Sequence, residues 1–389
     1  MADRSIKDFV YQAGARKRIP VSGTFELTPR CNFNCKMCYV HMTPEEQKAY
    51  GRELSTEEWL TIGRRAVEAG MIYLLLTGGE PMLRPDFVTL YSELIQMGLV
   101  ISVNTNGTLI TPEMVECFRK HPPETVNVTL YGASSETYAK LCGVKGGYEK
   151  ALNGIRALKQ AGIRVALNTT FTACNQGDME ALIALAKELE LPIRTAAYTF
   201  PPVRNRHEDS GVCLLPEEQA KLNARFEFLA TIALRRKTKA DYLRRCLEAE
   251  LSRDPNAVDG QGKPSSCMAG RGAFWMSWNG EMYPCGMLAD YAVRSHGDFS
   301  DFTDMWRQIC ERTESVYLPS ACGECALRRI CPSCAAVTYS YSGDSRRLME
   351  GMCVYTRAYV RAYLELAEAE NETTPEGINR GDVDPFICL

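Results

Sequence analysis

The 389-residue sequence lacks any hydrophobic run that could cross a membrane. A spanning helix needs about 18 or more consecutive apolar residues, and no segment approaches that length. The first ten residues, MADRSIKDFV, are too polar for a signal peptide. With 45% hydrophobic and 24% charged residues, the composition predicts a globular, cytoplasmic protein of two or three domains with no membrane partner.

The sequence also lacks an excess of charge of one sign. Its formal net charge is −3, its isoelectric point is near 6.0, and its lysines and arginines are spread along the chain. Nucleic-acid-binding proteins usually carry a concentrated basic surface. We therefore expect no nucleic-acid partner.

Cysteine, in contrast, is abundant, with 17 residues in the chain. Thiols stay reduced in the cytosol, so metal ligation is a better interpretation than disulfides. Ten cysteines form two groups: Cys31, Cys35 and Cys38 near the start, then Cys267, Cys285, Cys322, Cys325, Cys331, Cys334 and Cys353. The other seven stand alone and are expected to be small buried hydrophobic residues: Cys117, Cys142, Cys174, Cys213, Cys246, Cys310 and Cys388.

Between residues 20 and 200, short apolar runs alternate with amphipathic stretches, which predicts an α/β fold with an open barrel of about six βα units. The predicted strands are residues 21–27, 71–77, 100–105, 125–131, 163–171 and 193–200. The predicted helices lie near 55–69, 86–98, 112–119, 147–161 and 177–189. Ligands in such folds gather at the carboxyl ends of the strands.

The first cysteine group comes directly after the first predicted strand and Pro29. On a helix these three cysteines would share one face, so the alternative to a metal-binding loop is a helix that buries them in the core. Their neighbours Asn32, Asn34 and Lys36 are polar, which favours a loop around a cluster. Four-iron clusters usually take four thiolates. Three would leave one iron open, as at a catalytic metal.

The spacing Cys-x3-Cys-x2-Cys, followed by TGGEP after the second predicted strand, resembles the radical S-adenosylmethionine (radical SAM) superfamily. The resemblance covers residues 20–200 and implies a partial (β/α)6 radical SAM barrel. It implies that Cys31, Cys35 and Cys38 hold a [4Fe-4S] cluster whose open iron binds S-adenosylmethionine. Reductive cleavage of that cofactor would give a 5′-deoxyadenosyl radical that abstracts hydrogen from the substrate.

The resemblance also implies cofactor contacts at several strand ends. Gly78 and Gly79 would let the backbone approach the methionine amino group, and Glu80 would suit its charge, although GGE is also compatible with an ordinary turn. The remaining candidates are amide, hydroxyl and apolar side chains: Asn104 and Asn106 in NTNGT, Asn168 and Thr170 on the fifth strand, and Met37 beside the adenine. Asn104 to Asn106 would suit a ribose or carboxylate, with a plain Asn-Gly turn as the alternative.

The second cysteine group resembles the SPASM extension, a C-terminal domain of some radical SAM enzymes that carries two auxiliary four-iron clusters. The features are Gly280-x4-Cys285 and the quartet Cys-x2-Cys-x5-Cys-x2-Cys, and a zinc ribbon is the alternative. The resemblance implies an outer cluster on Cys322, Cys325, Cys331 and Cys353, and an inner one on Cys267, Cys285 and Cys334. We hypothesise that the inner cluster has an open iron for a substrate thiolate, unless Cys246 or Cys310 fills it.

The chain therefore divides into five expected regions. They are an N-terminal segment (1–20), the radical SAM barrel (21–213), a helical bridge (214–260), a cysteine-rich SPASM domain (261–355), and a C-terminal helix and tail (356–389). The polar stretch 199–211 is either a solvated linker or a substrate lining with five charged or ionisable candidates: Arg204, Arg206, His207, Glu208 and Asp209.

Auxiliary clusters can accept an electron, which favours net oxidation of the substrate. SPASM enzymes mostly act on peptides, so the resemblance implies oxidative crosslinking of a ribosomally made peptide. The alternatives are a sulfatase-type protein maturase, an enzyme acting on tetrapyrrole side chains, or a non-catalytic zinc scaffold. Expected partners are the peptide, a separate leader-binding protein, and a flavodoxin or ferredoxin reductant. No catalytic base is assigned.

Overall fold

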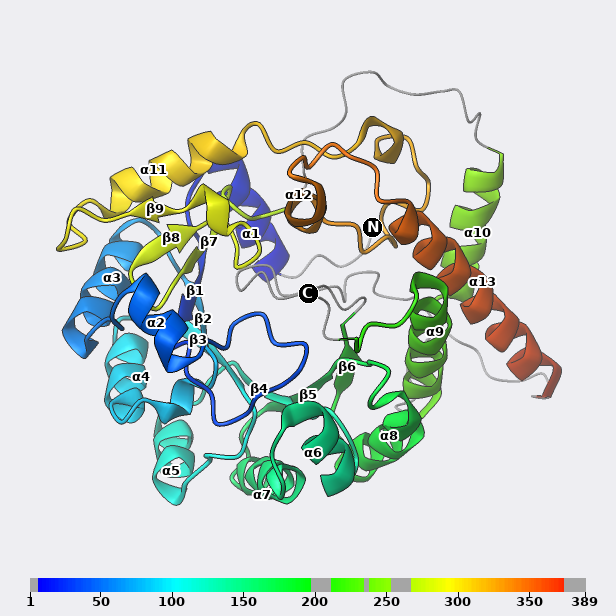
Figure 1. Cartoon of the computed structure of the whole chain (residues 1–389), viewed down its shortest axis with the longest axis horizontal. Helices are drawn as coiled ribbons and strands as arrows, with labels where there is room; N and C mark the ends of the chain where they lie inside the picture. The colour runs from blue at the N-terminus through cyan, green and yellow to red at the C-terminus, as the bar shows by residue number, and fades with distance from the viewer. Residues whose placement is uncertain (1–5, 197–210, 234–237, 253–266, 374–389) are drawn as a thin grey trace.

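The protein is represented by a computed structural model that describes residues 6–196, 211–233, 238–252 and 267–373. One nine-stranded sheet runs through it in the order β6-β5-β4-β3-β2-β1-β7-β8-β9. Figure 1 shows this sheet curving, with helices α3 to α8 following one another around its outer side. The predicted α/β architecture with a partial barrel is confirmed.

Strands β1 to β6 are parallel and confirm the six predicted strands; β3 has the predicted bounds, and the other five are shorter than expected. They are β1 Ser22–Glu26, β2 Tyr73–Thr77, β3 Val100–Thr105, β4 Thr125–Thr129, β5 Val165–Thr169 and β6 Ile193–Thr195. The five predicted helices are α3 Thr56–Glu68, α4 Phe87–Gln96, α5 Pro112–Lys120, α7 Gly147–Gln160 and α8 Met179–Glu188. A capping box formed by Ser55 and Glu58 starts α3.

Several short helices were not predicted from the sequence. They are α1 Ile6–Lys17, α2 Pro44–Tyr50, α6 Ser135–Cys142, α11 Phe302–Thr313 and α12 Ala335–Ser342. Helix α2 begins with a capping box formed by Thr43 and Glu46, a sequence pattern that marks the start of a helix. Helix α6 is only two turns long and ends at Gly143 with φ of 72°, so periodicity alone gives little signal for it.

The C-terminal region contributes strands to the barrel sheet, which the sequence did not predict. Strand β7 (Ala273–Met276) pairs in parallel with β1, and β8 (Glu281–Tyr283) and β9 (Val293–Arg294) continue the sheet antiparallel. Phe274 of β7 packs against Phe302 and Trp306 of α11, with ring centroids 5.4 and 6.3 Å apart. The cysteine-rich region is thereby attached to the edge of the barrel.

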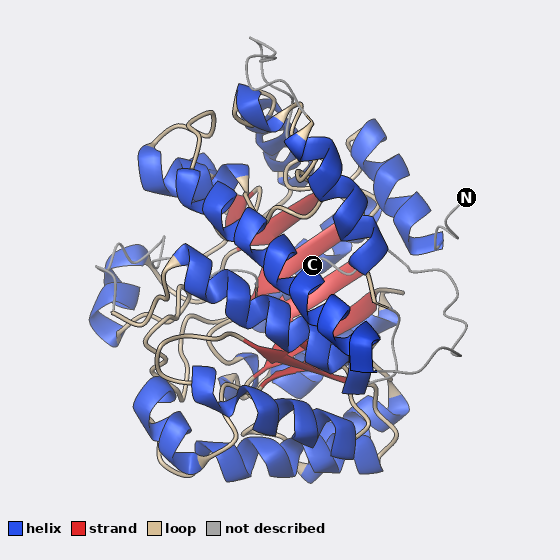
Figure 2. Ribbon diagram, turned by 90° about the vertical axis from the view of Figure 1, so that its right-hand side faces the viewer, coloured by secondary structure: helices blue, strands red, loops and turns tan. Residues whose placement is uncertain are grey.

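The two faces of the barrel strands differ in polarity. Side chains on the outer face, such as Val103 and Val126, are completely buried beneath the helices. Figure 2 shows the strands enclosed by helices. The inner face carries half-buried polar residues, among them Asn104 and Asn127. This polar concave wall can hold a ligand.

Three further helices pack together beside β6: α9 Pro216–Ala233 next to the strand, α13 Glu350–Thr373 against α9, and α10 Ala240–Leu251 against α13. Helices α9 and α10 lie within the segment expected to be a helical bridge, and α13 begins before Cys353 and continues past it. Asn223 of α9 donates to the hydroxyl of Tyr355 on α13 at 2.8 Å. No helix among the described residues is long and apolar enough to cross a membrane.

Gly154 should be essential for packing α7 against the Asn-Gly turn that follows β3. A Cβ at Gly154 would lie 2.1 Å from the carbonyl oxygen of Gly107, whose backbone cannot move aside cheaply. We expect Gly154→Ala to lower the free energy of unfolding by about 1–3 kcal/mol, the usual cost of overpacking. Gly177→Ala is the control, because a Cβ there meets nothing within 4 Å. Equal denaturation midpoints for the two variants would contradict the packing seen here.

Candidate active site

The first cysteine group lies in a loop at the carboxyl end of β1, not on a helix. The loop is attached to the end of α6: Asn34 N donates to Cys142 O at 2.9 Å, and Lys36 N donates to Leu141 O at 3.1 Å. Phe33 packs edge-on against Tyr138 of α6, with centroids 5.9 Å apart. The predicted loop is confirmed, and α6 holds it in place.

Backbone amides surround the thiols of this loop. Phe33 N donates to Cys31 Sγ, and His41 N donates to Cys38 Sγ, each at 3.3 Å. Burial raises the pKa of Cys31 to about 12, so its thiol stays protonated until a cation displaces the proton. Three half-buried thiols on one loop, with amide donors at two sulfurs, fit a cluster held by three thiolates.

Gly78 and Gly79 follow β2 and lie against the chain that leads into the cysteine loop. Gly79 N donates to Thr28 O at 2.7 Å, and Glu80 N donates to Arg30 O at 2.8 Å. A Cβ at Gly79 would lie 2.3 Å from Arg30 O, and one at Gly78 would lie 2.6 Å from Thr28 O. The two glycines were expected to make room for a ligand. In this structure, a side chain at either position would instead collide with the backbone of residues 28–30.

Glu80 is fully buried between the ends of β2 and β3. It accepts hydrogen bonds from Asn106 N at 2.8 Å, Thr105 Oγ1 at 2.9 Å and Met82 N at 3.1 Å. Burial raises its pKa to about 7, although these donors oppose the shift. A buried carboxylate without a basic partner in this set of contacts is well suited to an incoming ammonium group.

Asn106 connects the third strand end to the cysteine loop. Its Nδ2 donates to Asn32 Oδ1 at 2.7 Å and lies 3.9 Å from Cys31 Sγ, while its Oδ1 accepts from Thr108 N at 3.0 Å. Asn104 points to the inner face instead, where it accepts from Asn127 Nδ2 at 3.0 Å. The two asparagines of NTNGT therefore occupy different environments.

The other predicted cofactor residues are more dispersed. Asn168 is half-buried on β5, and Thr170 follows that strand, where its carbonyl accepts from Asn175 Nδ2 at 2.9 Å. Met37 is buried in the main hydrophobic core. Their part in cofactor binding stays a prediction.

An ionic network beneath the cysteine loop was missed from the sequence. Glu53 accepts from Thr28 Oγ1 and from Arg30 Nε, each at 2.7 Å. Buried Arg84 donates to Leu27 O at 3.2 Å and pairs with Asp86 at 2.7 Å. Burial opposes ionisation of Glu53, but the hydrogen bonds from Arg30 and Thr28 and the charge of Arg84 hold its pKa below the usual range.

The second cysteine group forms two neighbourhoods. Cys267, Cys285 and Cys334 line one small cavity together with Arg271 and Thr313. Cys322 lies near Cys331 and Cys353, which belong to the same expected cluster site. Burial, followed by the charges of these two neighbours, raises the pKa of Cys322 to about 11. The geometry is consistent with the division expected from the SPASM resemblance.

Neither cysteine group is arranged around a single metal ion in the described part of the chain. Among the described residues, no three His, Cys, Asp or Glu side chains converge on a point where they could hold a single metal ion. Tetrahedral zinc with Zn–S bonds near 2.3 Å requires sulfurs about 3.8 Å apart. In a four-iron cluster each thiolate binds a different iron, so the sulfurs stand further apart.

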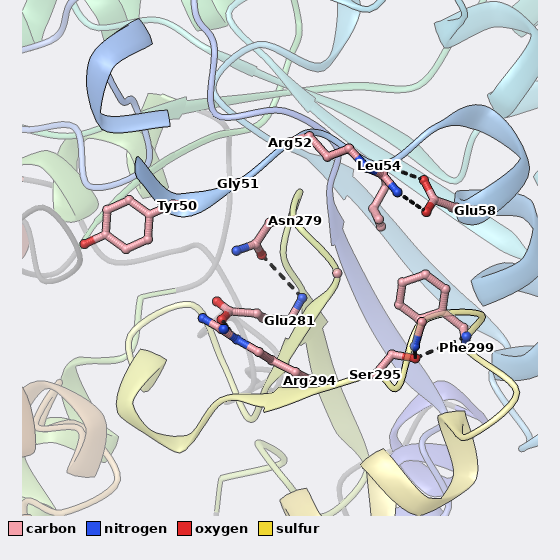
Figure 3. Close-up of a pocket in the computed structure, with 12 residues that line it drawn as sticks. Tyr50, Gly51, Arg52, Leu54, Glu58, Asn279, Glu281, Arg294, Ser295 and Phe299 are labelled. Atoms are coloured by element: carbon pink, nitrogen blue, oxygen red, sulfur yellow. Dashed lines mark hydrogen bonds and ion pairs between the residues drawn. The ribbon is translucent and has the colours of Figure 1, made fainter. Parts of the chain in front are cut away.

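A larger pocket of about 250 Å³ lies between residues 50–58 and the β7–β9 strands (Figure 3). Its two arginines are paired, Arg52 with Glu58 at 2.6 Å and Arg294 with Glu281 at 2.5 Å. None of the residues that line it is a cysteine. This pocket is separate from the candidate catalytic loop.

The predicted lining at 199–211 lies outside the described residues except for Gly211, and so do the tail after Thr373 and Cys388. Two residues near the site were not anticipated. Cys142 is buried beside Cys35, whose pKa is raised first by a hydrogen bond with the Cys142 thiol. Asp178 accepts from Ala133 N at 2.7 Å and so places a carboxylate at the turn after β4.

A three-thiol loop lies at the carboxyl end of a partial parallel barrel, with a glycine turn and a buried carboxylate beside it, which is the arrangement expected from the radical SAM resemblance. Residues 25–187 match the family described as the radical SAM superfamily. The chain is a radical SAM enzyme, and its family implies a [4Fe-4S] cluster and S-adenosylmethionine as cofactors.

The similarity to known proteins extends beyond the barrel. The chain is 28% identical to an AdoMet-dependent heme synthase from Methanosarcina barkeri over 85% of this chain and 95% of the relative. It is 26% identical to a PqqA peptide cyclase from Ruegeria pomeroyi over 83% of this chain and 82% of the relative. The structure of native anSMEcpe with bound AdoMet has the same fold, with a TM-score of 0.66 and 17% identity, covering 91% of this chain and 100% of that one.

Glu53 should stabilise the entrance to the cysteine loop. In Glu53→Gln the side chain keeps its shape but loses the charged acceptor of Arg30, so we expect a loss of about 1–3 kcal/mol in unfolding free energy. Because the folded-state pKa is depressed, this contribution is present above the ordinary value of 4.5 and fades as the pH falls below it. Denaturation at pH 7 and pH 4 measures both effects.

The matched control is Glu116→Gln on α5, whose pairing with Arg119 is exposed. It should leave the unfolding midpoint unchanged at both pH values. A Glu53→Gln variant as stable as this control would show that the network beneath the loop is dispensable.

Proposed function

We propose that this radical SAM enzyme oxidises a side chain of a tetrapyrrole. The observation that carries the proposal is similarity along nearly the whole chain to AdoMet-dependent heme synthases, with 28–29% identity over 86–95% of the length of three such relatives. Coverage of 85% of this chain extends well past the barrel into the cysteine-rich region. The Fe-coproporphyrin III synthase of Methanosarcina barkeri, 33% identical over 41% of its length, also concerns an iron tetrapyrrole.

We assign the catalytic [4Fe-4S] cluster to Cys31, Cys35 and Cys38. Three thiolates leave one iron for the amino and carboxylate groups of S-adenosylmethionine, and the buried carboxylate of Glu80 beside Cys31 supports a role in binding the amino group. When bound, the cluster and cofactor supply the radical that abstracts hydrogen. The chain's own contribution is to hold the loop, exclude water and orient the cofactor through residues such as Asn106.

Two auxiliary clusters would complete the oxidation. The cavity shared by Cys267, Cys285 and Cys334 supports one cluster, and the neighbourhood of Cys322, Cys325, Cys331 and Cys353 supports the other. Hydrogen abstraction leaves a substrate radical, and loss of one further electron yields a closed-shell product. A flavodoxin or ferredoxin in the cytoplasm would reduce the catalytic cluster.

A ribosomally made peptide is the second candidate substrate. Its support is the similarity to the PqqA peptide cyclase and the fold shared with Streptococcus suis SuiB bound to its precursor peptide SuiA, at a TM-score of 0.63 and 16% identity. Two other peptide cyclases match only 45% of their own length, which is why this substrate ranks second. Peptide modification would also call for a leader-binding partner.

Iron and acid-labile sulfide analysis tests the cluster assignment. Anaerobically reconstituted protein should hold about twelve irons, at four per cluster. The triple variant Cys31→Ala/Cys35→Ala/Cys38→Ala should hold about eight. About four irons falling to none, with zinc bound elsewhere, would contradict the auxiliary clusters and leave the C-terminal cysteines as a structural site.

Substrate class is tested by anaerobic turnover with S-adenosylmethionine, a chemical reductant and iron coproporphyrin III. Mass spectrometry should show a changed porphyrin mass together with 5′-deoxyadenosine, and neither with the triple cysteine variant. An unchanged porphyrin, with modification of a short peptide encoded beside this chain, would overturn the proposal in favour of the second candidate.

A further inference from the structure

The inner wall of the barrel carries a row of amide side chains that ends in one arginine. Thr129, Asn168 and Arg194 are register partners across β4, β5 and β6, and Asn104 and Asn127 are partners across β3 and β4. All five are half-buried, while their neighbours Val103, Val128 and Ile193 are buried in the core on the outer side. Along β3 to β6, the described inner face is therefore uncharged except at Arg194.

Arg194 is weakly engaged by the protein. Its Nη2 donates to Asn127 Oδ1 at 3.4 Å, a long contact with a neutral acceptor. No carboxylate of the described residues forms an ion pair with it. In contrast, Lys7, the cation that α1 brings to the amino end of the same barrel, pairs with Glu124 at 2.6 Å. A guanidinium has five donors, and the described residues accept from Arg194 only in the one hydrogen bond to Asn127.

We propose that Arg194 binds a carboxylate of a ligand inside the barrel. Guanidinium groups bind carboxylates in a planar, two-pronged geometry, and partial burial strengthens such a pair. The side-chain amides of Asn127 and Asn168 are uncharged hydrogen-bond donors. They can contact a carboxylate of the ligand, and they do not form an ion pair with Arg194. This inference rests on the proposed function, because a tetrapyrrole with propionate side chains brings carboxylates into the barrel.

The carboxylate has two possible sources, the substrate and the methionine part of S-adenosylmethionine. Reconstituted wild type, Arg194→Met and Arg194→Lys are compared for binding of coproporphyrin, its tetramethyl ester and S-adenosylmethionine. Arg156→Met, an exposed site on α7, is the control. Arg194→Met should weaken coproporphyrin binding at least tenfold, leave binding of the uncharged ester within twofold, and be partly rescued in Arg194→Lys.

A tenfold loss of S-adenosylmethionine affinity instead would assign the carboxylate to the cofactor and still support the role of Arg194. Affinities for both ligands within twofold of wild type, in a variant with unchanged thermal midpoint, would overturn it. If Arg194→Met fails to fold, Arg194→Gln takes its place. Failure of the wild type to bind coproporphyrin would contradict the proposed function, and the S-adenosylmethionine comparison would then decide the role of Arg194.

Discussion

The close approach of two backbones at the top of the barrel is the constraint on which the candidate site depends. The turn at Gly78 and Gly79 touches the backbone of residues 28–30, and two amide–carbonyl hydrogen bonds join them. A Cβ on either glycine would push the chain that enters the cysteine loop. The position of the three thiols is therefore set by β2 as much as by β1, and Glu80 extends the same connection to β3.

This constraint links the catalytic loop to the C-terminal region. Strand β7 extends the sheet from β1, and Leu54 N donates to Trp278 O at 2.9 Å just after the ionic network of Glu53 and Arg84. The cysteine-rich region is thus joined to the entrance of the catalytic loop by a strand pairing and a backbone hydrogen bond. In the proposed reaction, the catalytic loop starts the radical chemistry and the cysteine-rich region receives an electron.

Local patterns in the sequence predicted the strands, the main helices and the cysteine loop, because each depends on periodicity or spacing within a few residues. The attachment of β7 to β1 joins residues about 250 apart, which no local pattern reveals. The same holds for Glu53 with Arg84, and for Cys142 beside Cys35. The Gly-Gly pair was recognised, but its steric partner in this structure is protein backbone, which only the tertiary fold shows.

The central claim is that three thiolates leave an iron to which S-adenosylmethionine binds directly. Electron–nuclear double resonance on the reduced enzyme, with the second cysteine group replaced and the cofactor labelled with ¹⁵N at its amino group, measures this contact. Direct binding of the cofactor to the cluster should give a ¹⁵N hyperfine coupling from a nitrogen bonded to iron, absent when Cys31, Cys35 and Cys38 are alanine. A reduced cluster whose spectrum shows no coupling at saturating cofactor would contradict it.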